Sequence, residues 1–137
     1  MPTQSRMVFL NLPVKDLDKS VAYFTQLGFT FNPQFTDENA TAMVVSEQAI
    51  VMLLVEPFFK TFTGKEIADP ATHTEAIVGL SAESREEVDA LCDRAIELGG
   101  SVAGEPQDHG FMYGRSFHDL DGHLWEFIWM DPAAAQG

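Results

Sequence analysis

The sequence has a single cysteine and no long apolar run. The one thiol, Cys92, cannot form an internal disulfide, and the first residues lack the basic start and apolar stretch of a secretory signal. The longest apolar stretch, 49–55, has the length of a strand and is far shorter than the roughly 20 residues that span a membrane. We therefore expect a cytoplasmic protein without a membrane partner.

Basic residues are also scarce. Eight lysines and arginines stand against 21 acidic residues, which gives a net charge of −13. Such a chain repels phosphate backbones and attracts cations, so nucleic acid is excluded as a partner and a basic ligand is favoured. A solvated acidic surface explains the same charge. The sequence contains no Ser-His-Asp pattern, phosphate loop or dinucleotide fingerprint, which argues against hydrolases and nucleotide-binding proteins.

Tyrosine is rare, whereas phenylalanine and methionine are common. Two tyrosines accompany eleven phenylalanines and six methionines, and 45% of the residues are hydrophobic. This composition indicates an interior or a pocket of adaptable apolar side chains. A chain of 137 residues supports one continuous core, so we expect a single domain over 1–137.

The first half predicts a strand, a helix and three strands. Residues 8–14 alternate, with Leu10 and Leu12 on the face expected to meet a helix and Phe9 and Asn11 on the other face. The helix begins at Asp16 or Asp18 and stops at the glycine of the LGF sequence. The three strands that follow are expected at 30–36, 41–46 and 49–56.

The second half repeats this order after a less regular stretch. A strand is predicted at 74–82, and Ser84 with Glu87 forms a capping box for a helix that ends before two glycines. Further strands are expected at 101–107, 111–118 and 123–130. The pattern is βαβββ twice, an α+β arrangement, and each module is too small to bury its own sheet face. The predicted parts are module 1 at about 6–56, a linker at about 57–72 and module 2 at about 73–131.

Two segments carry a resemblance to a known family. The sequences LNLPVKDLDKSVAYFTQLGF and FHDLDGHLWEFIWMD resemble the two signatures of the vicinal-oxygen-chelate superfamily, which includes glyoxalases, bleomycin-resistance proteins and extradiol dioxygenases. The stretch EPQDHGFMYGRSFHDLDGHLWEFIWMD is similar to predicted lactoylglutathione lyases. The resemblance implies two βαβββ modules whose curved mixed sheet surrounds a cavity, with helices on the outer face, a small-molecule ligand and a homodimer.

The resemblance also implies four positions for metal ligands. They fall on Phe9, Met52, Glu75 and Glu126. A phenyl ring cannot bind a metal and a thioether has little affinity for hard divalent ions, so two of the four ligands are missing. We expect no tightly bound metal. A divalent ion held by a partial set remains an alternative, with the ligands His73, Glu75 and Glu126 and with Asn11 as an optional fourth.

Glu126 is the most informative candidate, because it lies in a strand that is apolar on both faces. A buried carboxylate without a partner costs several kcal/mol, so it must meet donors, a cation or a ligand. A two-residue turn before this strand would pair it with Arg115. A three-residue turn ending at Gly122 would place Ser116 opposite it instead. The glycine favours the longer turn, which directs Arg115 away.

Other polar residues are assigned simpler roles. Glu75 is either an exposed glutamate at a strand end or a cavity residue. Asp119 and Asp121 are expected to bond backbone amides in a turn, and Cys92 is expected to be a packed thiol. The remaining histidines are predicted to be solvated loop residues: His109, His118 and His123.

Two functions remain. In the first, a metal-free protein binds a small apolar or cationic compound, with Phe9, Met52, Leu54 and Met112 as walls and Glu75 and Glu126 as anchors. Further ligand contacts are expected from Asn11, Ser116 and Arg115. The alternative is a metal-dependent lyase, isomerase or dioxygenase in which Glu126 or Glu75 is the catalytic residue that moves a proton.

Overall fold

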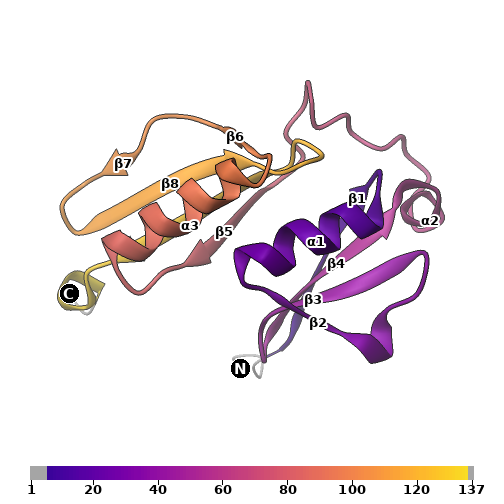
Figure 1. Ribbon diagram of the computed structural model, residues 1–137, viewed down its shortest axis with the longest axis horizontal. Helices are drawn as coiled ribbons and strands as arrows, with labels where there is room; N and C mark the ends of the chain where they lie inside the picture. The colour runs from indigo at the N-terminus through magenta and orange to yellow at the C-terminus, as the bar shows by residue number, and fades with distance from the viewer. Residues whose placement is uncertain (1–5, 136–137) are drawn as a thin grey trace, which may run out of the picture. The chain divides into compact units, whose positions relative to one another are not determined.

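The structure is a computed structural model that describes residues 6–135, and it divides into two compact units (Figure 1). Unit 1 comprises Met1–Ile67 and unit 2 comprises Ala68–Gly137. The boundary lies inside the stretch that we predicted as a linker. Among the described residues, no helix is both long and apolar enough to cross a membrane.

Unit 1 is a four-stranded sheet with one long helix. Its order is β1 (Val8–Val14), α1 (Leu17–Leu27), β2 (Thr30–Asn32), the 3-10 turn η1 (Pro33–Phe35), β3 (Ala40–Ser46), β4 (Ala49–Val55) and α2 (Glu56–Lys60). The strands lie in the order β1-β4-β3-β2, and β1 runs parallel to β4 while the other pairs are antiparallel. In Figure 1, α1 lies across this sheet.

Unit 2 repeats this plan. Its elements are β5 (Ile77–Ser81), α3 (Arg85–Glu97), β6 (Ser101–Val102), β7 (Gln107–Asp108), β8 (Met112–His118), β9 (Leu124–Met130) and α4 (Pro132–Ala135). The strand order is β5-β9-β8-β6, with β7 also paired to β8, and β5 runs parallel to β9. The predicted α+β fold of two similar βαβββ halves is confirmed.

Both long helices begin at the capping residues that the sequence predicts. The Asp16 side chain accepts a hydrogen bond from the amide of Lys19, and Gly28 closes α1 with a φ of 118°. In α3, Ser84 accepts from the amide of Glu87, whose carboxylate accepts from the amide of Glu83. These bonds satisfy amides that the first helical turn leaves without partners.

Each unit buries one face of its sheet against its helix. In unit 1 the buried strand residues are Leu12, Val14, Met43 and Leu53, and the buried residues of α1 include Tyr23 and Phe24. In unit 2, Val88, Cys92 and Ala95 of α3 are buried, as are Phe117, Trp125 and Phe127 of the sheet. The rings of Phe117 and Phe127 stack with centroids 5.9 Å apart. The helix of each unit does not cover the opposite face of its sheet.

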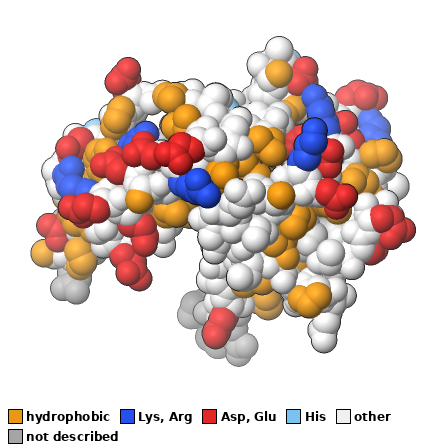
Figure 2. All heavy atoms as spheres, in the orientation of Figure 1, with side chains coloured by type: hydrophobic (Ala, Val, Ile, Leu, Met, Phe, Trp, Pro, Cys, Tyr) orange, Lys and Arg blue, Asp and Glu red, His pale blue; other side chains and the backbone are white. Residues whose placement is uncertain are grey.

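The outer face of α3 is charged. Figure 2 shows acidic side chains in a row over this helix, with basic side chains beside them. Arg94 and Glu97, one turn apart, form an ion pair of 3.4 Å on this face. Exposed pairs of this kind contribute little to stability, so the row is a solvated helix surface.

Four predicted elements differ in extent. The strand predicted at 30–36 ends at Asn32, because Pro33 begins a 3-10 turn that the Asn32 side chain caps. The strand predicted at 101–107 breaks into β6 and β7, since Gly104 and Pro106 interrupt the pairing. The strand predicted at 74–82 begins only at Ile77, and the irregular stretch after β4 contains the helix α2.

Candidate functional site

The open face of the unit 1 sheet carries a cavity of about 550 Å³. In the register of β1 and β4, Phe9 lies opposite Ile50 and Asn11 lies opposite Met52, so these side chains share one face. The cavity is lined by Met7, Phe9, Asn11, Asn32, Phe35, Ala42, Ile50 and Met52. Three residues predicted to contact a ligand, Phe9, Asn11 and Met52, therefore border one cavity.

A second cavity of about 480 Å³ adjoins the first along β1. Phe9 and Asn11 line both cavities, and Leu54 lines the second, as expected for a pocket wall. The other residues of this cavity are Leu10, Phe59, Phe62 and Thr63. The contribution of α2 was missed from the sequence, where the only signal was the closely spaced phenylalanines at 58, 59 and 62.

In unit 2, Glu126 lies on β9 opposite Ser116 of β8, which confirms the three-residue turn and its register. A hollow of about 290 Å³ lies over this face, and its lining includes Met112, Ser116 and Glu126. On the other side of β9, Glu126 pairs with Gly79 of β5. A Cβ atom at Gly79 would lie 3.1 Å from Oε1 of Glu126, so the glycine makes room for the carboxylate. Within residues 6–135, no hydrogen bond or ion pair engages this carboxylate.

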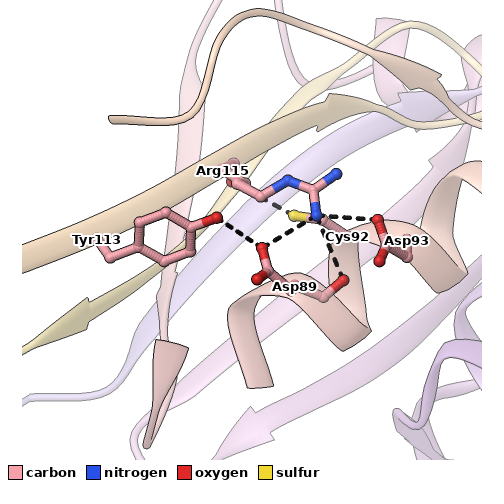
Figure 3. A network of polar contacts seen from close by, with 5 residues as sticks. All are labelled: Asp89, Cys92, Asp93, Tyr113 and Arg115. Atoms are coloured by element: carbon pink, nitrogen blue, oxygen red, sulfur yellow. Dashed lines mark hydrogen bonds and ion pairs between the residues drawn. The ribbon is translucent and has the colours of Figure 1, made fainter. Parts of the chain in front are cut away.

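Arg115 points to α3 and not to Glu126, which excludes the predicted alternative of an ion pair between them (Figure 3). Its guanidinium lies 3.1 Å from Oδ1 of Asp89 and 2.9 Å from Oδ1 of Asp93. The Tyr113 hydroxyl donates to Asp89 at 2.6 Å, and this bond, with Arg115, lowers the pKa of the Asp89 carboxyl. Arg115 borders the hollow over Glu126, but its charge is engaged elsewhere.

Cys92 is buried beside this network (Figure 3). Its Sγ lies 3.5 Å from the carbonyl oxygen of Arg115, and burial raises the pKa of the thiol to about 11. A thiol that remains protonated at neutral pH is a poor nucleophile. The predicted packed thiol is confirmed.

Glu75 and His123 form a pair that the sequence did not reveal. His123 is 2% exposed, so its prediction as a solvated loop residue is wrong, and its Nδ1 lies 2.5 Å from Oε1 of Glu75. The turn before the histidine is closed by hydrogen bonds to Asp119. Asp119 accepts from the amides of Asp121, Gly122 and His123 through Oδ1 and from the indole of Trp125 through Oδ2. The predicted turn role of Asp119 is confirmed, and burial raises the pKa of its carboxyl.

The sheet registers refine the positions that the resemblance assigned to metal ligands. Phe9 lies two residues before Asn11, the partner of Met52 on β4. In unit 2, the residue two before Gly79, the partner of Glu126, is Ile77. The position equivalent to Phe9 is therefore Ile77, and Glu75 precedes β5. Together the four positions hold a phenyl ring, a thioether, an aliphatic chain and one carboxylate.

The alternative ligand set is not assembled in unit 2. His73 is exposed, and its Nδ1 lies 2.8 Å from the hydroxyl of Thr72. The Glu75 carboxylate is engaged by His123. Across the described part of the chain, no three His, Cys, Asp or Glu side chains are grouped as they would be to hold a metal ion.

Comparisons with known proteins agree with this architecture. Residues 6–127 match the family model described as Glyoxalase/Bleomycin resistance protein/Dioxygenase superfamily. A hypothetical protein from S. aureus is 32% identical, with a TM-score of 0.77 over 93% of this chain and 95% of that one. None of the curated proteins compared with the chain matches it.

Two more distant structures share the fold alone. A glyoxalase/bleomycin resistance protein/dioxygenase family enzyme from Burkholderia phytofirmans is 13% identical, with a TM-score of 0.75 over 91% of this chain and 98% of that one. A genomically encoded fosfomycin resistance protein from Listeria monocytogenes is 21% identical, with a TM-score of 0.66 over 93% of this chain and 92% of that one.

Proposed function

The chain belongs to the Glyoxalase/Bleomycin resistance protein/Dioxygenase superfamily, and we propose that it binds a small, largely apolar molecule in the unit 1 cavity without a divalent metal. The observation that carries the proposal is the identity of the side chains at the ligand positions. Catalytic zinc sites use three protein ligands, and other divalent ions prefer oxygen or imidazole donors. Phe9, Met52 and Ile77 supply none of these.

The unit 1 cavity has the properties of a small-molecule site. Its volume lies within the range of roughly 300–1,000 Å³ that is typical of such sites. Its walls are mostly apolar, and Asn11 and Asn32 are the two polar residues among them. An apolar ligand would remove both its own surface and the walls from water, which is the main driving force for binding.

Within unit 2, Glu126 is proposed as a separate ligand contact in its own hollow. Its carboxylate has no partner in residues 6–135, lies over a glycine and shares its sheet face with Met112 and Ser116. A carboxylate in such a place can accept a hydrogen bond, attract a cationic group or accept a proton from a substrate. If the protein is a catalyst, Glu126 is the candidate base. Glu75 instead positions the turn before β9 through His123.

We also propose a homodimer, which the family resemblance implies, and a cytoplasmic location, which the sequence predicts. A homodimer is supported by exposed apolar side chains such as Val8, Ile77 and Met130. A cytoplasmic location is supported by the lone thiol of Cys92. A lactoylglutathione lyase activity, or another metal-dependent reaction, would require ligands that the positions named above do not supply.

The experiment is equilibrium dialysis with naphthol, a compact, neutral and fluorescent molecule, after treatment of the protein with a chelator. The wild type is expected to bind the probe. Met52→Glu is expected to abolish binding, because ligand entry would then desolvate a carboxylate inside the cavity.

Val102→Glu is the matched control, since it places the same charge on an exposed strand residue of unit 2 that lines neither unit 1 cavity. It is expected to bind naphthol like the wild type. Equal binding by Met52→Glu and the control, or no binding by the chelator-treated wild type, would refute the proposal.

A further inference from the structure

We infer that the ligand is an uncharged, elongated molecule with two apolar parts joined by a hydrogen-bonding group, and that α2 completes the site for its second part. The inference rests on the proposed function and adds a ligand class to it. It starts from the two adjoining cavities of unit 1, of about 550 Å³ and 480 Å³.

The two cavities meet at β1, the edge strand of the unit 1 sheet. Asn11 lies opposite Met52, which lines the first cavity, and Pro13 lies opposite Leu54, which lines the second. Since alternate residues of a strand share a face, Met52 and Leu54 point to the same side of the sheet. Phe9 and Asn11 line both cavities, so a ligand that fills both must pass over these two residues.

The second cavity exists because β4 continues directly into α2. Pro57 lies in the first turn of this helix, where its fixed φ favours the helical conformation. The amide of Phe62 donates to the carbonyl oxygen of Phe59 at 3.0 Å, and Nζ of Lys60 donates to the carbonyl oxygen of Lys65 at 3.0 Å. These bonds hold Phe59 and Phe62 in place as walls of the cavity.

Phe62 is 70% exposed although it lines this cavity. Its ring packs edge-on against Phe58, with ring centroids 5.1 Å apart, so Phe58 already covers part of the aromatic surface. The exposed remainder is apolar area that a second aromatic or aliphatic group could cover. Burial of such area favours binding in proportion to the surface removed from water.

The lining indicates that the ligand is uncharged. Of the described residues around these two cavities, none is acidic or basic, although the chain carries a net charge of −13. Lys60 of α2 lies outside both linings, and its ammonium group is paired with Glu66 at 3.2 Å. An ion would lose its hydration here without gaining an opposite charge, which is costly.

Asn11 indicates where the ligand carries its polar group. The other polar side chains of the linings each already accept one hydrogen bond, because Asn32 accepts from the amide of Gln34 and Thr63 accepts from the amide of Lys65. The Asn11 amide has no hydrogen-bond partner in the part of the chain that the structure describes. A side-chain amide both donates and accepts, so it suits an amide, carbamate or similar group between the two apolar parts.

The test measures binding of three probes by equilibrium dialysis: naphthol, benzanilide and stilbene. Benzanilide has two phenyl rings joined by an amide, and stilbene has a similar shape without the amide. Phe62→Ala is expected to weaken benzanilide binding about tenfold and to leave naphthol binding unchanged. Because Phe62 is largely exposed, this variant is expected to fold like the wild type, which circular dichroism checks.

Asn11→Leu tests the central hydrogen bond. It is expected to weaken benzanilide binding about tenfold without weakening stilbene binding, since only the amide loses a partner. Benzanilide carrying a carboxylate or an ammonium group is expected to bind at least about tenfold more weakly than the parent compound.

The outcomes separate this inference from the proposed function. If naphthol binds and Met52→Glu abolishes its binding, but Phe62→Ala and Asn11→Leu leave benzanilide unaffected, the second part of the site is refuted and the proposed function stands. If the wild type binds no probe, both fail. Binding that weakens as the protein concentration rises would show that a second copy covers this face, which would also overturn the inference.

Discussion

The substitution of Asp119 provides a sharp test of how unit 2 holds the strand that carries Glu126. Asp119 is 6% exposed, and its carboxylate accepts four hydrogen bonds. Oδ1 accepts from the amides of Asp121, Gly122 and His123 at 2.9–3.0 Å, and Oδ2 accepts from the indole nitrogen of Trp125 at 2.8 Å. The two oxygens therefore have separate tasks that two substitutions can distinguish.

Asp119→Asn can keep the three amide bonds but turns a donor toward the Trp125 indole. An unpaired buried donor costs about 1–3 kcal/mol, and relief of the buried charge offsets part of it, so we expect a loss of about 1–2 kcal/mol in the free energy of unfolding. Asp119→Ala also removes the Oδ1 acceptor from all three amides, of which Gly122 alone keeps a partner, the backbone carbonyl oxygen of residue 119 at 3.1 Å. Since two of these lie in a half-exposed turn that water can reach, we expect a loss of about 3–5 kcal/mol.

Urea unfolding followed by tryptophan fluorescence measures both losses. The two tryptophans, Trp125 and Trp129, lie on β9, so the signal reports unit 2. Asp131→Asn is the control, because its Oδ1 accepts a single amide and the substitution preserves that acceptor. Two results would refute the reasoning: Asp119→Asn as harmless as the control, or Asp119→Ala no worse than Asp119→Asn.

Three further predictions concern the core and the charge network of unit 2. Cys92, with a pKa of about 11, should resist alkylation at pH 8 in the native protein and react after unfolding; equal rates in both states would contradict its burial. Phe117→Ala should lower the free energy of unfolding by about 3–5 kcal/mol in the same urea assay, whereas less than about 1 kcal/mol would contradict its place in the core. Asp89 has a lowered pKa, so its stabilising effect should be present above the ordinary value of 3.8 and be lost as the pH falls below it. Thermal unfolding of Asp89→Asn should show less of this loss than the wild type, and identical pH profiles would count against the network.

Local patterns in the sequence predicted much of the fold because neighbouring residues decide it. The alternation in β1 placed Phe9 and Asn11 on the face that carries the cavities. Gly122, with a φ of 98°, set the turn and so the register that opposes Ser116 to Glu126. The positive φ that Gly122 adopts therefore decides that Ser116 and Glu126, ten residues apart in sequence, lie opposite each other.

Features that depend on distant contacts were not predictable in this way. His123 is buried and pairs with Glu75, 48 residues earlier, and no local pattern indicates that partner. The length of β5 was overestimated because its first predicted residues resemble a strand, whereas the amides of residues 71–73 donate hydrogen bonds to Asp69 and form a turn. By register, Ile77 and not Glu75 has the place in β5 that Phe9 has in β1.

The central claim is that the protein binds a small apolar molecule without a divalent metal. A measurement of bound metal, made together with a ligand-binding assay, tests it most directly. The protein would be purified without chelators or a metal-binding tag, and bound metal per chain would be measured by elemental analysis for the wild type and Glu126→Gln. We predict substoichiometric metal in both proteins and an affinity for naphthol that neither a chelator nor added Ni²⁺, Zn²⁺, Mn²⁺ or Fe²⁺ changes. Stoichiometric metal that is lost in Glu126→Gln, with probe binding that requires it, would contradict the account.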